Sequence, residues 1–236
     1  PIAFLVIFLS LVILFGDFVF SDKMLHGSDT ISAGYFFRSL FVESLQTTGS
    51  VPQWNPYIFG GMPYIEAFHG DIFYPLSYPF KRFMPLERGL GWSLFWHIFL
   101  AGIFMYLAAR QFKLGKTASL LSGVSYMFAP YLVSLVAPGH DGKIFVTTLF
   151  PLVILFIERA FERRPLLNFS LLGLVLGLII LSPHPQMSYF TLWGAGFYTL
   201  YKLVNLYLET RSPMKLALPA SLAAYAVVIA LCLSAI

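Results

Sequence analysis

Residues 166–182, "LLNFSLLGLVLGLIILS", contain no charged side chain. A run of this kind is close to the length of about 20 apolar residues that one helix needs to cross a bilayer. Further apolar stretches lie at about 1–20, 90–111, 117–137, 144–161, 187–208 and 214–236. Because these stretches are continuously apolar and do not alternate, they favour helices over a β-barrel. The sequence predicts an all-α fold, a polytopic transmembrane helical bundle with about seven spans.

The composition agrees with this fold class. Of the 236 residues, 58% are hydrophobic and 11% are charged, whereas a soluble domain carries roughly 25% charged residues. The single cysteine, Cys232, cannot form an internal disulfide or a cysteine cluster for zinc. Because the chain begins and ends inside apolar runs, we expect residues 1–236 to be one transmembrane domain, a fragment of a longer protein. We expect residues 1–20 to be its first span, since no signal-peptidase motif follows them.

The basic residues predict the orientation of the bundle. Nine of the fifteen Lys and Arg residues lie in three short connections, near 110–116, 158–165 and 202–215. Positive charge marks cytoplasmic connections, so we expect these three loops and the N-terminus to be cytoplasmic. The long connection 21–89 is then an outer loop, followed by six further spans in 90–236. The basic residues do not gather on one soluble face, so no nucleic-acid partner is expected.

Acidic and imidazole side chains collect on the opposite, outer side. The residues concerned are Asp17, Asp22, Asp29, Asp71, Asp141, His26, His69, His140 and His184, with His97 in the outer half of 90–111. Ionisable groups near membrane depth are candidates for function. We therefore expect the active face to be extracytoplasmic.

The outer loop begins with an amphipathic pattern. Apolar residues follow a helical stripe through 28–48, with Arg38, Glu43 and Gln46 on the other face, which predicts a helix on the outer membrane surface. Asp29 stands where such a helix begins. It is a candidate N-cap and, if it faces a cavity, equally a candidate general base.

The rest of the outer loop is irregular and aromatic. Trp54 and its aromatic neighbours are typical of an interfacial belt, and they would also suit a platform for a sugar ring or a lipid. His69 and Asp71 could supply half of a metal site. A divalent metal ion near Asp29 or near 69–71 is an option, although no ligand spacing supports it, and no cofactor is certain.

Two shorter outer turns carry the remaining candidates. In "PGHDGK" (138–143), Lys143 stands at the expected start of a helix. The positive end of the helix dipole disfavours a cation there, unless an anion binds between the Lys143 ammonium and the helix N-terminus. His140 would add a second donor to that anion. "SPHPQMSYF" (182–190) places His184 and Gln186 at the next outer turn. The alternative for Lys143 is a loop lysine that reaches into the lipid headgroups.

These motifs carry a family resemblance. "GSDT" (27–30), "VPQWNPYIFGGMPY" (51–64), "PGHDGK" and "SPHPQMSYF" resemble, in order and spacing, the N-terminal part of the YfhO-like bacterial membrane proteins, which are similar to the GT-C glycosyltransferases. Many relatives have His where this chain has Ser28, and another pair where it has Asp141-Gly142.

The resemblance implies a GT-C-like bundle in the bacterial cytoplasmic (inner) membrane. It implies transfer of a sugar from a polyprenyl-phosphate donor in the membrane lipid to a cell-envelope acceptor on the outer face. The acidic residue that matches the family's first outer loop is Asp29.

We expect Asp29 to be the general base, with His140 and Lys143 holding the lipid phosphate. His184 and Gln186 would bind phosphate or sugar, and Trp54, His69 and Asp71 would complete the substrate site. The alternative function is a transporter or flippase of a lipid-linked or anionic solute, which the clustering of polar groups at one surface disfavours. A structural scaffold is a third reading, but it leaves the one-sided cluster unexplained.

Overall fold

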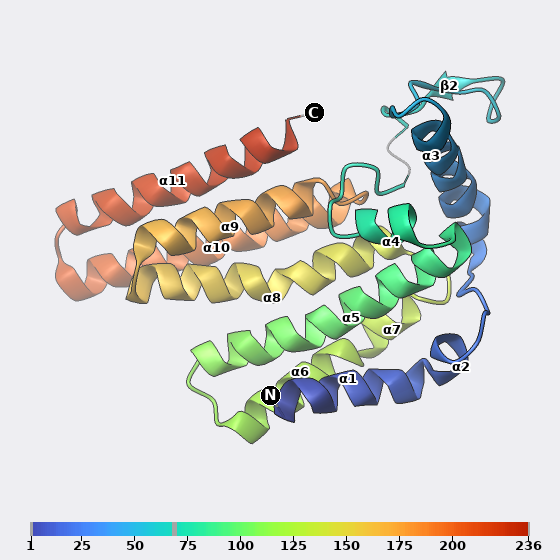
Figure 1. Cartoon of the computed structure of the whole chain (residues 1–236). Coiled ribbons are helices and arrows are strands. Elements are labelled where there is room, and N and C mark those ends of the chain that lie inside the picture. The colour runs from blue at the N-terminus through green and yellow to red at the C-terminus, as the bar shows by residue number, and fades with distance from the viewer. Residues whose placement is uncertain (1, 68–69, 236) are drawn as a thin grey trace.

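The computed structural model describes residues 2–67 and 70–235, and its architecture is all-α (Figure 1). A single two-stranded antiparallel ribbon, β1 (Trp54–Asn55) with β2 (Met62–Pro63), is the sheet structure within these ranges. In chain order the helices are α1 (Ile2–Leu14), α2 (Gly16–Val19), η1 (Thr30–Tyr35), α3 (Phe36–Thr47), α4 (Tyr78–Phe83), α5 (Leu86–Gln111), α6 (Lys116–Met127), α7 (Pro130–Ser134), α8 (Asp141–Glu162), α9 (Pro165–Ile180), α10 (Pro185–Thr210) and α11 (Met214–Ser234).

Within the described ranges, three helices are long and apolar enough to cross a membrane, namely α5, α8 and α11. The helices α1 and α9 are apolar but shorter. At a rise of 1.5 Å per residue, the 13 residues of α1 extend about 20 Å, less than a hydrocarbon core of about 30 Å. α10 has the length of α5, but its Tyr, Trp, Gly and hydroxyl residues make it less apolar. The structure thus supports a membrane protein, but not a full set of seven spans.

One expected span is interrupted. The sequence predicts a single helix over 117–137, whereas the structure divides it into α6 and the five-residue α7. Pro130 is the first residue of α7, and Ala129 before it has an extended ψ of 134°. A proline disfavours helical backbone in the preceding residue, which ends α6 and separates the two helices. The prediction of an unbroken helix was wrong here.

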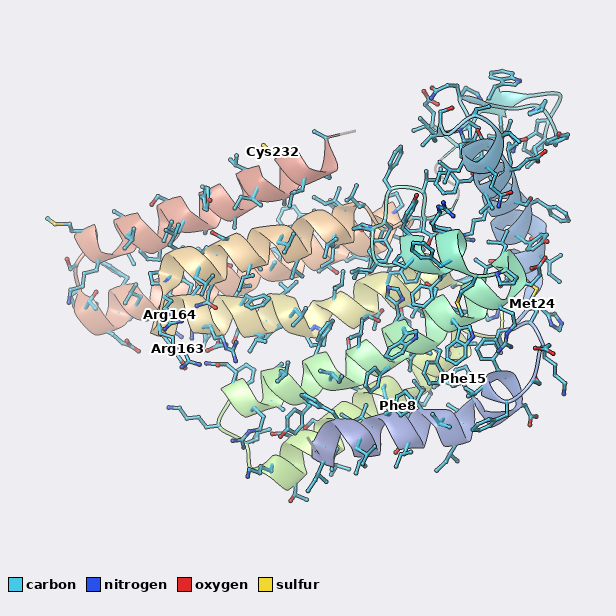
Figure 2. All side chains as sticks on the ribbon, in the orientation of Figure 1. Phe8, Phe15, Met24, Arg163, Arg164 and Cys232 are labelled. Carbon is cyan, nitrogen blue, oxygen red and sulfur yellow. The ribbon has the colours of Figure 1, made fainter. Side chains whose placement is uncertain are left out.

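The helices lie side by side, so that their connections fall at two ends (Figure 1). The connections α5–α6, α8–α9 and α10–α11 lie at one end, on the left in Figure 1, and include the predicted basic loops. Figure 2 shows Arg163 and Arg164 at this end and Met24 at the other. The starts of α5 and α8, the α9–α10 turn and α3 all lie at that second end, which we call the site end.

Apolar side chains hold the bundle together. A continuous cluster built on residues such as Ile98, Phe145, Leu149 and Ile179 joins α5, α8 and α9. A second cluster of Phe37, Phe41 and Tyr64 holds the β1–β2 ribbon against α3, which lies across the site end (Figure 1). The expected helix over 28–48 is therefore present, as η1 continued by α3, and Phe37 and Phe41 of its apolar stripe are buried, whereas Phe36 is exposed.

Candidate functional site

A polar cavity of about 260 Å³ opens at the site end. Its walls come from four segments far apart in the sequence: the η1–α3 helix with Asp29 before it, Gly70, residues 139–143 and the α9–α10 turn. The charged and imidazole side chains that line it are Asp29, Arg38, His140, Asp141, Lys143 and His184. Four of the predicted site residues, Asp29, His140, Lys143 and His184, are thus brought to one place.

Two glycines let the chain segments meet this closely. A Cβ atom on Gly27 would stand 2.1 Å from the carbonyl oxygen of Ala137, and one on Gly139 would stand 1.9 Å from Oγ1 of Thr30. Gly139 also has a φ of +87°, which favours glycine. With side chains absent at both positions, the backbone N–H of Asp29 donates a 2.9 Å hydrogen bond to the carbonyl of Pro138. The "GSDT" and "PGHDGK" motifs therefore pack against each other directly.

The α9–α10 turn is fixed to the first turn of α8. Ser182 Oγ donates a 3.0 Å hydrogen bond to the carbonyl of Gly142, and a Cβ on Gly142 would stand 3.0 Å from the carbonyl oxygen of Pro183. His184 caps α10, because its Nδ1 accepts a 3.3 Å hydrogen bond from the N–H of Met187. The other ring nitrogen of His184, Nε2, takes no part in this capping hydrogen bond.

Asp29 pairs with His140. Oδ2 of Asp29 lies 2.8 Å from Nε2 of His140, and the side chain of Asp29 is 53% exposed. Asp29 occupies the position before η1, but its side chain makes no capping hydrogen bond. Of the two interpretations that the sequence left open for Asp29, the geometry favours a carboxylate that faces the cavity.

Lys143 is the third residue of α8, as its predicted place at a helix start requires. It lines the cavity, and its ammonium forms no hydrogen bond or ion pair within the part of the chain that the structure describes. Burial, together with the charge of Lys143, holds the pKa of His184 below its ordinary value. A neutral His184 therefore stands beside a cationic Lys143.

Asp141 modifies the expected anion site. Its Oδ1 accepts a 2.7 Å hydrogen bond from the N–H of Gly142, so its own carboxylate occupies part of the α8 N-terminus. Its Oδ2 accepts a hydrogen bond from Nη2 of Arg38. An anion in the cavity would consequently meet Lys143 and His184, with fewer free backbone N–H groups than the sequence suggested.

Arg38 is the residue that sequence reasoning missed. The helical pattern assigns Arg38 to the polar outer face, and that assignment was wrong, because Arg38 is only 3% exposed and lines the cavity. Its Nε lies 2.5 Å from Oδ1 of Asp71. A spacing of three or four residues from Gly34, Phe41 and Val42 places Arg38 beside the buried stripe, and this signal was present in the sequence.

Asp71 is buried in an ion-pair network and does not line the cavity. Nζ of Lys81 lies 3.1 Å from its Oδ1 and donates a 2.6 Å hydrogen bond to its carbonyl oxygen. Burial would raise the pKa of Asp71, but Arg38 and Lys81 outweigh this and hold that pKa far below its ordinary range. Asp71 thus forms structural ion pairs in this geometry, and its expected substrate-binding role stays a prediction.

The remaining predicted residues are not brought to the cavity. Trp54 is 54% exposed on the β1–β2 ribbon, where its indole covers Gly61. Gln186 is exposed at the start of α10 and does not line the cavity. His69 lies outside the described residues. Among the described residues, no group of three or more His, Cys, Asp or Glu side chains could hold a metal ion.

No protein-family model, curated protein or solved structure matches the chain. The resemblance to YfhO-like proteins accordingly remains a prediction from the motifs.

Proposed function

We propose that the protein is a membrane glycosyltransferase of the GT-C type, which transfers a sugar from a polyprenyl-phosphate donor to an acceptor in the cell envelope. One observation carries the proposal: an exposed carboxylate paired with an imidazole, Asp29 with His140, shares a cavity with Lys143, a cation without an ion pair among the described residues. Sugar transfer from a lipid phosphate needs a base that takes the proton of the acceptor hydroxyl and a cation that stabilises the leaving phosphate.

The reaction proceeds by displacement at the anomeric carbon of the sugar. An acceptor hydroxyl oxygen bonds to that carbon while the bond from the carbon to the phosphate oxygen breaks, and the phosphate leaves with the electron pair. Asp29 takes the proton of the hydroxyl. His140, at 2.8 Å, orients the Asp29 carboxylate toward the cavity.

Lys143 and His184 face the leaving group. As the bond breaks, negative charge grows on the phosphate, and a fixed cation beside it lowers the barrier. Lys143 supplies that charge, and the nitrogen of His184 that is not used in capping α10 supplies a hydrogen bond. Asp141 does not oppose the phosphate strongly, because Arg38 pairs with its carboxylate.

The membrane arrangement is part of the proposal. We place the protein in the bacterial cytoplasmic membrane with about seven spans, the N-terminus and basic loops in the cytoplasm, and the cavity outside. The apolar helices α5, α8 and α11 and the gathering of the three basic connections at one end support this orientation. The short helices α1 and α9 would then cross only with a locally thinned bilayer or with residues beyond their ends.

The test uses the intact gene in a deletion strain, complemented with wild type, Asp29→Asn or Lys143→Ala at matched abundance. Mass spectrometry of envelope glycans should show a hexose-type increment that wild type restores and both variants lose. Lys215→Ala, an exposed lysine at the opposite end, is the matched control and should restore it. Unchanged glycans in the deletion strain would contradict the proposal, and movement of a lipid-linked solute would then be the activity to assay.

A further inference from the structure

Asp29 and Arg38 line one cavity although a regular helix would separate them. They are nine residues apart, which is about two and a half turns of an α-helix, so they would point to opposite sides. The intervening segment η1 is a π-helix, whose wider turns contain more residues and advance less per residue. This change of register brings the carboxylate and the guanidinium to the same side.

Arg38 then ties this helix to α8. Its Nη2 donates to Oδ2 of Asp141, the first residue of α8, only two residues before Lys143. The guanidinium is packed on its other side, since a Cβ on Gly34 would stand 2.8 Å from Nη1 of Arg38. The register of the helix that carries Asp29 is thus locked, through one side chain, to the turn that carries His140 and Lys143.

The second arm of Arg38 is anchored just as firmly. Asp71 holds Nε of Arg38 at 2.5 Å, and Lys81 of α4 holds both the carboxylate and the backbone carbonyl of Asp71. α4 leads directly into α5, one of the long apolar helices. A chain of alternating charge, Asp141–Arg38–Asp71–Lys81, buried except for Asp141, therefore fixes the η1–α3 helix to two helices of the bundle.

We propose that Arg38 is a positioning residue: together with the π-helical turn η1, it holds the segment that carries Asp29 against the first turn of α8, which carries Lys143. This inference rests on the proposed function for its kinetic consequence, but its geometric content can be tested separately. Arg38 acts through the placement of Asp29, so its loss should lower the rate of transfer more than the affinity for the donor.

The kinetic test compares Arg38→Ala and Arg38→Lys. It uses membrane vesicles of the deletion strain, which contain the acceptor, and a short-chain polyprenyl-phosphate hexose as donor. A displacement of about 1 Å can cost roughly 100-fold in rate, so we expect Arg38→Ala to lower kcat about 100-fold with donor KM changed less than about threefold. Arg38→Lys keeps the positive charge but cannot contact Asp71 and Asp141 with the geometry of a guanidinium, so its kcat should be about tenfold higher than that of Arg38→Ala. Arg82→Ala, an exposed neighbour of Lys81, should behave as wild type.

The geometric test needs no transfer activity. Spin labels at Ile31 on η1 and Tyr189 on α10, both exposed, report the distance across the cavity by double electron–electron resonance, in a Cys232→Ala background. We expect Arg38→Ala to broaden or shift that distribution and Arg38→Lys to retain it. A second pair, Leu121 on α6 and Leu200 on α10, should not change in either variant.

Each outcome decides the inference. An Ile31–Tyr189 distribution that is unchanged in Arg38→Ala overturns it, whether or not the protein transfers a sugar. If the Leu121–Leu200 pair also changes, the variant has disturbed the bundle, and Asp141→Ala, which removes the acceptor of one arm of Arg38, replaces it with the same expected shift. A shifted distribution in a protein whose wild type transfers no sugar would uphold the positioning role and contradict the proposed function.

Discussion

Nε2 of His140 lies 2.8 Å from Oδ2 of Asp29, although 110 residues separate them in the chain. One group precedes the surface helix η1–α3 and the other precedes the bundle helix α8. Their meeting depends on glycines at the crossing, on the interlock of Arg38 with Asp141, and on the π-helical register of η1.

The crossing of the two segments depends on Gly27. We predict that Gly27→Ala destabilises the protein by about 1–3 kcal/mol, because the added methyl group meets backbone that cannot give way easily. It should also lower sugar transfer, since η1 moves away from α8. Gly16→Ala is the control, because nothing lies within 4 Å of a Cβ there. Thermal unfolding in detergent compares the two variants, and equal midpoints would contradict this prediction.

The ion pairs of Asp71 should make stability depend on pH. The folded-state pKa of Asp71 lies below that of the unfolded chain, so its contribution is present above the ordinary carboxyl pKa, about 3.9, and is lost as the pH falls below that value. Asp71→Asn should lower the free energy of unfolding by about 3 kcal/mol at pH 7. The difference in unfolding free energy between wild type and Asp71→Asn should shrink progressively as the pH falls from 5, because only wild type loses this contribution on protonation.

The control for this prediction is Asp22→Asn, which changes an exposed carboxylate on the same outer connection. Its unfolding midpoint should follow wild type at every pH. A difference between Asp71→Asn and wild type that stays constant as the pH falls would show that packing, and not ionisation, accounts for the loss of stability.

Anion binding should take up a proton at His184. Burial and Lys143 lower the pKa of His184, and a bound anion would offset the charge of Lys143 and raise that pKa again. We therefore predict that the affinity for a short alkyl phosphodiester, whose own charge is constant, rises about three- to tenfold as the pH falls from 7.5 to 5.5.

His184→Asn isolates this effect, because Asn can still cap α10. Calorimetric titration of the variant should give a flatter dependence of affinity on pH. The same slope in both proteins would mean that another group takes up the proton.

The exposed aromatic ribbon should not contribute to donor binding. Trp54 covers Gly61 and stands apart from the residues that line the cavity, and Gln186 is likewise exposed outside it. We predict that Trp54→Ala and Gln186→Ala change donor KM by less than about threefold, whereas Lys143→Ala raises it by at least tenfold. A large rise in donor KM for Trp54→Ala would contradict this prediction and show that the β1–β2 ribbon contributes to sugar binding.

Much of the fold follows from hydrophobic patterning. The continuous apolar runs predicted α5, α8, α9, α10 and α11 close to their observed bounds, because burial of such runs leaves helix as the way to satisfy the backbone. The break before Pro130 was missed, because hydropathy averaged over 117–137 does not register one proline. The length of the first span was likewise overestimated, because α1 ends at Leu14 and the expected span ran over 1–20.

The cavity was predictable in part. The motifs around Asp29, His140 and His184 were predicted to form one substrate site, and the fold brings these three residues to one cavity. Arg38 was assigned to the polar face because it is charged. Its ion-pair partners Asp71 and Asp141 come from distant segments, so the sequence did not reveal that its charge is compensated in a buried position. The π-helical turn has no signature in hydrophobic periodicity, so the register that joins Asp29 to Arg38 could be seen only in the structure.

The most direct measurement of the central claim is the rate at which the purified, intact protein in nanodiscs converts a polyprenyl-phosphate hexose into polyprenyl phosphate and glycosylated acceptor from envelope extract. Wild type and Asp29→Asn are compared under saturating donor. The account predicts that Asp29→Asn is slower by about 10²–10⁴-fold with donor KM nearly unchanged, because the carboxylate accepts the proton in the transition state. Equal rates for the two proteins would contradict the assignment of Asp29 as base, and the absence of transfer by wild type would contradict the proposed function itself.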